Sequence, residues 1–77
     1  MSKTVLITGV AGLLGSRLAD WIAENKPEYK IVGVDDLSGG YKENINPKVE
    51  FNNLNLVDGD IEKIFLAYKI DYVFHFA

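Results

Sequence analysis

The sequence contains no cysteine, one histidine and only two prolines. Without cysteine, neither a disulfide framework nor a thiolate metal site can form, which is compatible with a reducing cytoplasm. No apolar run approaches the roughly 18 residues of a membrane span, and the N-terminal run is too short for a signal peptide. The net charge of −3 and the scattered charges form no electrostatic surface for nucleic acid or an anionic membrane. We therefore expect a cytoplasmic protein that binds neither nucleic acid nor membrane.

A chain of 77 residues has room for one small domain. A domain of this size buries only roughly 60% of the surface that its unfolded chain exposes, so its core is marginal. The composition, with 48% hydrophobic and 25% charged residues, is nevertheless typical of a folded protein. We expect residues 1–77 to form a single domain.

Hydrophobic patterning predicts strands that alternate with helices. Short β-branched or aromatic runs predict strands over residues 4–8, 30–35, 49–53 and 72–77. A first helix follows the glycines after residue 8 and ends at Asn25-Lys26-Pro27, because proline cannot continue it. Asp58 or Asp60 can cap a second helix. Right-handed crossovers then predict a partial Rossmann fold of the α/β class, with a parallel sheet of about four strands in the order 3-2-1-4 and one helix on each face.

Helical spacing predicts which large side chains face the core. The apolar stripes of the two helices are Leu14, Leu18, Trp21 and Ile22, and Ile61, Ile64, Phe65 and Tyr68. We assign Trp21, Phe65 and Tyr68 to the core rather than to a cofactor site. The single histidine, His75, lies in an apolar strand, and we expect it to pack in the core rather than to act in catalysis.

The strongest functional signal is the segment Thr8-Gly-Val-Ala-Gly-Leu-Leu-Gly15 between a predicted strand and a predicted helix. Gly9 lets the chain turn sharply, at a φ that can be positive. Gly12 has no side chain to keep a pyrophosphate from the backbone amides, and Gly15 lets the helix pack closely. The helix N-terminus then offers N–H groups to phosphates. A tight turn without a ligand is the alternative, and a triphosphate P-loop is poorly supported because no Gly-Lys-Ser/Thr follows.

An acidic residue stands where a dinucleotide-binding domain needs one. Asp35 ends the second predicted strand, twenty residues after Gly15, where its carboxylate can accept hydrogen bonds from both hydroxyls of the adenosine ribose. The carboxylate would repel a 2′-phosphate, which favours NAD over NADP, and the only arginine, Arg17, precedes the strand. The alternative is an acidic surface turn, and Asp36 is balanced between a cofactor contact and solvation. The long polar loop 36–47 that follows favours a ligand role.

These segments resemble a known family. The glycine-rich turn, Asp35-Asp36-Leu37-Ser38-Gly39-Gly40 and His75-Phe76-Ala77 are together similar to the extended short-chain dehydrogenase/reductases. Within that superfamily the chain most resembles the nucleotide-sugar epimerases and dehydratases, above all the UDP-glucose 4-epimerases. The resemblance covers the whole chain but only the first part of such an enzyme. It implies that the chain is the NAD-binding piece of a longer protein.

The resemblance also implies contacts with NAD. The backbone of Leu13 and Leu14 would lie at the pyrophosphate, and Asp36, Ser38 and Gly39 would lie beside Asp35 at the ribose. The family's adenine-contacting Asp and aliphatic residue are replaced by Asn55 and Leu56. The complete predicted set is Gly9, Gly12, Leu13, Leu14, Gly15, Asp35, Asp36, Ser38, Gly39, Asn55, Leu56, Phe76 and Ala77, the last two passing beneath the middle of the cofactor.

No catalytic residue is expected in this chain. The family's chemistry needs a Tyr-x-x-x-Lys pair on a later helix, and none of the four tyrosines has a lysine four residues on. A nucleotide-sugar substrate is therefore expected only for a longer parent chain. Two other hypotheses stay open: a stand-alone, non-catalytic nucleotide-binding module, and a self-associating protein whose exposed final strand forms dimers or exchanges strands.

Overall fold

The sheet has the predicted topology. The computed structural model describes residues 3–54 and 61–76. Its strands are β1 (Thr4–Thr8), β2 (Lys30–Asp35), β3 (Val49–Asn53) and β4 (Tyr72–His75). They are parallel and lie in the order β3-β2-β1-β4, which confirms the predicted order 3-2-1-4. Only β4 differs in its bounds, since it ends two residues before the prediction.

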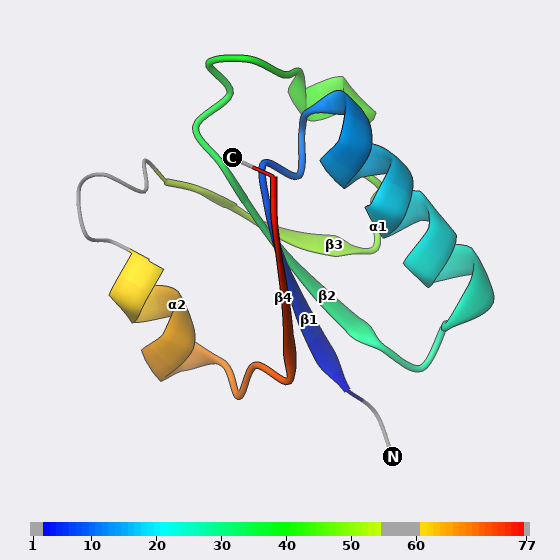
Figure 1. Ribbon diagram of the computed structural model, residues 1–77, viewed down its shortest axis with the longest axis vertical. Coiled ribbons are helices and arrows are strands. Elements are labelled where there is room, and N and C mark those ends of the chain that lie inside the picture. Colours follow the sequence, from blue (N-terminus) through cyan, green and yellow to red (C-terminus); the bar gives the residue numbers. More distant parts are fainter. Residues whose placement is uncertain (1–2, 55–60, 77) are drawn as a thin grey trace.

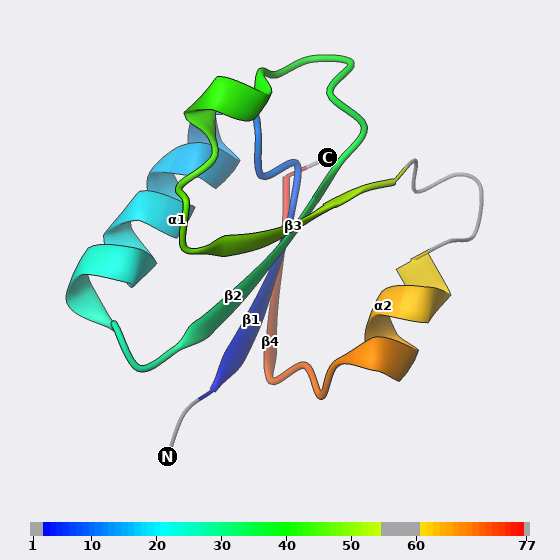
Figure 2. The same cartoon turned by 180° about the vertical axis from the view of Figure 1, so that it is seen from behind.

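One helix covers each face of the sheet, as predicted for a Rossmann fold. Figures 1 and 2 show α1 (Leu13–Asn25) and α2 (Ile61–Ala67) on opposite sides of the strands. A 3-10 turn, η1 (Lys42–Asn44), interrupts the loop after β2 and lies beside the start of α1 (Figure 1). Helix α1 ends before Pro27, and the Lys26 amide donates its last hydrogen bond to the Ile22 carbonyl at 2.7 Å. The predicted cap of α2 lies outside the described residues.

The central strands β1 and β2 are buried on both faces, and their successive side chains alternate between the two faces. In β1, Val5 and Ile7 belong to the cluster beneath α1, whereas Leu6 belongs to the cluster beneath α2. From α2, Ile64 completes the second cluster and is 4% exposed. Continuous apolar runs, rather than alternating ones, therefore form the central strands.

The predicted apolar stripe of α1 is wrong in part, since Ile22 is buried and Leu18 packs partly buried against the core, but Leu14 and Trp21 do not. Leu14 is 64% exposed and Trp21 is 54% exposed, whereas Ile22 is buried. The buried residues of α1 are Gly15, Ser16, Ala19, Ile22 and Ala23. Small side chains let the helix axis approach the sheet, so a stripe of small residues is buried although its hydrophobicity is low. The larger side chains are left on the neighbouring surface of the helix.

The core assignments near the end of the chain are also wrong in part. Tyr68 packs partly buried against the α2-side cluster, as expected, but Phe65 is 49% exposed. Strand β4 is exposed along its length, His75 included. The reason is position, because β4 is an edge strand and α2 has only seven residues with which to cover it.

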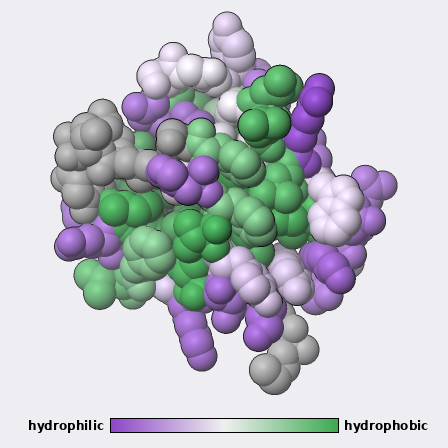
Figure 3. Space-filling model, viewed as in Figure 1, coloured by the Kyte–Doolittle hydropathy of each residue, from purple (hydrophilic) through white to green (hydrophobic). Residues whose placement is uncertain are grey.

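An apolar surface results from this exposure. Figure 3 shows hydrophobic residues gathered over α2 and the neighbouring sheet. The exposed apolar side chains of these elements are Phe65, Leu66, Tyr72, Val73 and Phe74. Such a surface is compatible with the predicted self-association, which stays a prediction. Within residues 3–54 and 61–76, no helix is long and apolar enough to cross a membrane.

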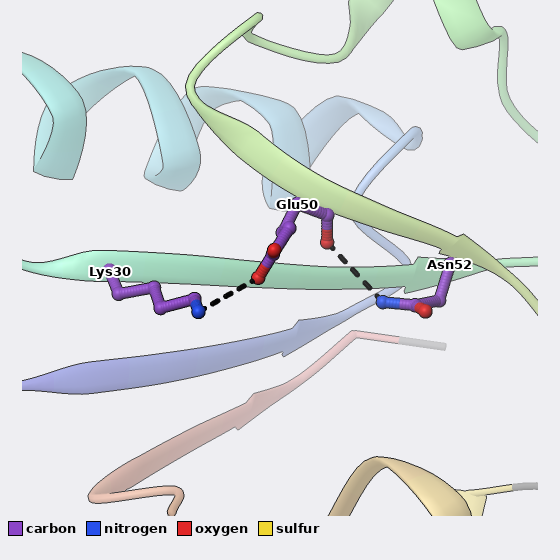
Figure 4. Close-up of polar contacts among 3 residues, drawn as sticks. All are labelled: Lys30, Glu50 and Asn52. Carbon is purple, nitrogen blue, oxygen red and sulfur yellow. Dashed lines mark hydrogen bonds and ion pairs between the residues drawn. The ribbon is translucent and has the colours of Figure 1, made fainter. Parts of the chain in front are cut away.

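A small polar cluster joins β2 to β3 (Figure 4). The Lys30 Nζ lies 3.1 Å from the Glu50 Oε2, with both side chains half exposed, and 4.9 Å from the centre of the Tyr68 ring. The Asn52 side-chain amide donates to the Glu50 carbonyl at 3.4 Å. An exposed ion pair of this kind contributes about 0–1 kcal/mol, so it adds little to the stability of the pair of strands.

The buried face of α1 can be tested by three substitutions at two adjacent residues. Ile22→Ala should lower the free energy of unfolding by about 2–5 kcal/mol because it leaves a cavity in the core, and Ile22→Val should lower it by about 0.5–1.5 kcal/mol. Trp21→Ala should lower it by less than about 1 kcal/mol, since this side chain is half exposed. Urea unfolding followed by circular dichroism measures all three. Equal losses for Trp21→Ala and Ile22→Ala would contradict the assigned face.

Candidate functional site

The glycine-rich turn connects β1 to α1 and is tied to the end of β2. Gly9 has a φ of 73°, which confirms the predicted positive φ and lets the chain leave the strand abruptly. The Gly9 amide donates to the Val34 carbonyl at 2.8 Å, and the Gly12 amide closes the turn by donating to the Gly9 carbonyl at 3.1 Å. The turn is therefore fixed to the sheet by its own backbone.

Gly15 makes a close contact that the prediction did not include. A Cβ at this position would overlap the Gly9 carbonyl oxygen and lie 2.9 Å from the Gly9 carbonyl carbon. Because these are backbone atoms, they cannot move aside cheaply. The first turn of α1 thus packs against the preceding glycine-rich turn itself, and not only against the sheet.

The N-terminus of α1 is open. Gly12 is the N-cap residue with no side-chain cap, and the first turn contains no acidic residue. The first helical hydrogen bond runs from the Ser16 amide to the Gly12 carbonyl at 3.0 Å. The amides of Leu13, Leu14 and Gly15 therefore have no helical carbonyl four residues earlier to which they could donate. They lie at the positive end of the helix dipole. This arrangement is suited to binding an anion.

Asp35 has a structural role that the sequence did not reveal. Its Oδ2 accepts a hydrogen bond from the Ala11 amide at 2.9 Å, and its Oδ1 accepts one from the Leu37 amide at 2.8 Å. The carboxylate therefore joins the glycine-rich turn to the loop after β2. Each carboxylate oxygen can accept a second hydrogen bond, so the carboxylate keeps acceptor capacity for the predicted contact with ribose hydroxyls.

The residues after Asp35 form a tight local turn. The Asp36 Oδ1 accepts hydrogen bonds from the Ser38 hydroxyl at 2.7 Å and from the Ser38 amide at 2.9 Å. These two bonds lower the pKa of Asp36 from its ordinary value, and the bond from the Ser38 hydroxyl has the larger effect. Leu37, between them, has a φ of 65°. Asp36 and Ser38 thus bond to each other, while a Cβ at Gly39 would meet only open space.

The end of β4 is attached to β1 by side chain and backbone. The Thr8 Oγ1 and the His75 Nδ1 lie 2.6 Å apart, and the Phe76 amide donates to the Thr8 carbonyl at 3.1 Å. The prediction that His75 packs in the core is wrong. His75 is exposed, and its side chain is hydrogen-bonded to Thr8 on the neighbouring strand. The bond places Phe76 beside the glycine-rich turn, at the carboxyl edge of the sheet.

The structure brings most of the predicted residues to one end of the sheet. The glycine-rich turn, the loop after β2 and the end of β4 all lie at the carboxyl ends of the strands (Figure 1). Open parallel sheets bind ligands at this edge, next to the topological switch point. Here that point is at β1, which has β2 on one side and β4 on the other. Asn55, Leu56 and Ala77 lie outside the described residues. Among residues 3–54 and 61–76, no cluster of acidic residues and histidine could hold a metal ion.

Comparison with known proteins identifies the family. Residues 5–77 match the model of the NAD-dependent epimerase/dehydratase family. The chain belongs to this family. A UDP-glucose 4-epimerase of Mycolicibacterium smegmatis is 36% identical over 77 residues, which cover 94% of this chain and 24% of that enzyme.

Solved structures of this epimerase/dehydratase family agree with the fold. The UDP-glucose 4-epimerase of Thermotoga maritima, solved with UDP-glucose, superposes with a TM-score of 0.88 at 39% identity, over 96% of this chain and 24% of that one. The UDP-glucose 4-epimerase of Thermus thermophilus, solved with NAD, gives a TM-score of 0.87 at 29% identity, over 96% and 24%. The chain thus spans about a quarter of the length of these relatives.

The hydrogen bonds from Ser38 to Asp36 can be tested by titrating the Asp36 carboxyl group. The Asp36 pKa should lie below its ordinary value of 3.8, so the stabilisation of this turn is complete above that pH and is lost as the pH falls through the lowered pKa. The pH dependence of the Ser38 amide resonance measures the midpoint. Ser38→Ala should raise the pKa of Asp36 towards 3.8, measured on the Asp36 carboxyl carbon. The same midpoint in both proteins would show that the hydroxyl has no effect.

Proposed function

We propose that this chain binds the adenosine and pyrophosphate half of NAD, as the amino-terminal portion of a nucleotide-sugar epimerase or dehydratase. One observation carries the proposal: the uncapped, acid-free N-terminus of α1 lies beside the carboxylate of Asp35 at the end of β2. The first feature is suited to a pyrophosphate and the second to a ribose. The family match and the NAD complex of the Thermus thermophilus relative support the choice of cofactor.

The pyrophosphate would be held by backbone rather than by side chains. The amides of Leu13, Leu14 and Gly15 point out of the first turn of α1, and the side chains of Leu13 and Leu14 are 66% and 64% exposed. Gly9 and Gly12, which carry no side chain, leave the approach to these amides open. A cationic side chain is therefore not needed for the contact.

The ribose would be held by Asp35. Its oxygens already accept the Ala11 and Leu37 amides, so the carboxylate is fixed in position before any ligand binds. A fixed negative charge accepts two ribose hydroxyls and repels a 2′-phosphate, which favours NAD over NADP. Asp36, Ser38, Gly39, Asn55 and Leu56 are proposed around the adenosine, with Phe76 and Ala77 beneath the pyrophosphate.

NAD supplies hydride transfer in such enzymes, and this chain would bind and orient only part of it. The sequence contains no Tyr-x-x-x-Lys pair. We therefore propose that the acid-base step and the nucleotide sugar itself belong to a longer parent enzyme. Binding by this chain alone should be weak, because the contacts to the nicotinamide half are not among its proposed residues.

Substitution of Asp35 tests the proposal. Asp35→Asn should weaken NAD binding by about tenfold or more, because hydrogen bonds to a charged acceptor contribute about 1.5–3 kcal/mol. The preference for NAD over NADP should also fall, since the repulsion of the 2′-phosphate is removed. Titrations followed by amide resonances, with NAD and NADP at millimolar concentration, suit weak binding. Glu24→Gln, which removes one negative charge near the far end of α1, is the matched control, and the absence of any NAD-induced shift in the unsubstituted chain would refute the proposal.

Self-association is a second proposal, favoured by the exposed apolar side chains of β4. Val73 and Phe74 are 50% and 41% exposed on β4, which pairs with β1 on one side and lies at the edge of the sheet that the structure describes, where another strand can add. Sedimentation should show dimers whose fraction rises with protein concentration, and Val73→Lys should reduce that fraction. A compact monomer at high concentration would exclude the proposal.

A further inference from the structure

The loop after β2 lies directly against the glycine-rich turn, at a residue that the predicted site did not include. We propose that Gly40 and Asn44 are positioning residues, which fix the peptide between Ala11 and Gly12 and thereby the amides that would bind pyrophosphate. This inference rests on the proposed function for its ligand, but its structural part can be tested without one.

Gly40 packs onto one peptide group of the turn. A Cβ at Gly40 would overlap the Ala11 carbonyl oxygen and lie 2.5 Å from the Ala11 carbonyl carbon and 2.9 Å from the Gly12 nitrogen. All three atoms belong to the same backbone peptide, which cannot rotate away without breaking the turn. Only glycine therefore fits at this position while the turn keeps its shape.

Two side chains hold the same segment. The Asn44 side-chain amide donates to the Ala11 carbonyl at 3.4 Å, and the Asp35 carboxylate accepts the Ala11 amide at 2.9 Å. Ala11 is thus held through both of its backbone polar groups, while Gly40 presses on the peptide plane. The orientation of this peptide determines where Gly12, the N-cap, starts α1.

The loop is itself anchored, so it can position the turn. Turn η1 places Asn44, and the adjacent Ile45 packs against the cluster beneath α1. The Asn46 side-chain amide donates to the Asp20 carboxylate of α1 at 3.0 Å. The loop therefore spans from the end of β2 to the side of α1, with the glycine-rich turn beneath it. A displacement of about 1 Å in such a supporting residue is enough to weaken a binding site.

Gly39 provides a matched control for this geometry. A methyl group at Gly39 would meet nothing within 4 Å, whereas the same group one residue later meets the turn. In the full 77-residue chain, Gly40→Ala should shift the amide resonances of Ala11 and Gly12 and speed the hydrogen exchange of the Ala11 amide. Gly39→Ala should leave these resonances near their original positions. Equal shifts in the two variants would overturn the inference.

A pair of ligands separates positioning from general destabilisation. Adenosine and ADP share the base and ribose, so their affinity ratio measures the contribution of the pyrophosphate. Gly40→Ala should reduce the affinity for ADP relative to that for adenosine about tenfold. Asn44→Ala should reduce it about two- to fivefold, because this variant loses one hydrogen bond. Gly39→Ala should change both affinities by the same factor. A merely structural role would lower the affinities for adenosine and ADP together.

Each remaining outcome decides the inference. If Gly40→Ala does not fold, the exposed Asn44→Ala variant carries the test through the Ala11 amide and the affinity ratio. If the unsubstituted chain binds neither ligand, the proposed function fails, while the amide resonances still show whether Gly40 positions the turn. Unchanged Ala11 and Gly12 resonances in both Gly40→Ala and Asn44→Ala would overturn the inference independently of any ligand.

Discussion

The Asp35 carboxylate joins parts of the chain that are far apart in sequence, and the shape of the carboxyl edge depends on it. Its oxygens accept the amide of Ala11, 24 residues earlier, and that of Leu37. The Asp35 carbonyl accepts the Leu54 amide at 3.2 Å, just beyond β3. Hydrogen bonds to an ionised acceptor are about twice as strong as neutral ones. One residue therefore connects the glycine-rich turn, the loop after β2 and the residue that follows β3.

The order of the elements could be predicted because each boundary has a local cause. Glycines at the end of β1 and Pro27 after α1 interrupt the backbone pattern, and β-branched runs between such points form strands. The buried face of α1 could not be predicted in this way. Burial there depends on how closely the helix approaches the sheet, so Ala19 and Ala23 are buried while Trp21 is exposed. Likewise, the exposure of Phe65 depends on which other elements pack against α2. The spacing of apolar residues along the helix does not contain that information.

The geometry of the candidate site was predictable where it is local. Gly9, Gly15 and Asp35 follow from motif spacing, because a turn between a strand and a helix constrains its own residues. The second role of Asp35 and the contact of Gly40 with the turn were not predictable. The Asn44 side chain reaches the Ala11 carbonyl across 33 residues, and its position depends on the path of an irregular loop. Loops of this kind have no periodicity from which a contact can be deduced.

A site built from backbone amides places its constraints on how the backbone packs rather than on side chains that face the ligand. The side chains of Leu13 and Leu14 are largely exposed, so their identity matters little to amides that any residue would provide. The constraints fall instead on Gly15 and Gly40, where an added methyl group would meet the backbone of the turn. On the proposed function, such a turn binds any pyrophosphate, whereas the charge of Asp35 distinguishes one dinucleotide from another. The turn thus contributes to affinity alone, whereas Asp35 contributes to the choice of cofactor and, because it also holds the turn, to affinity.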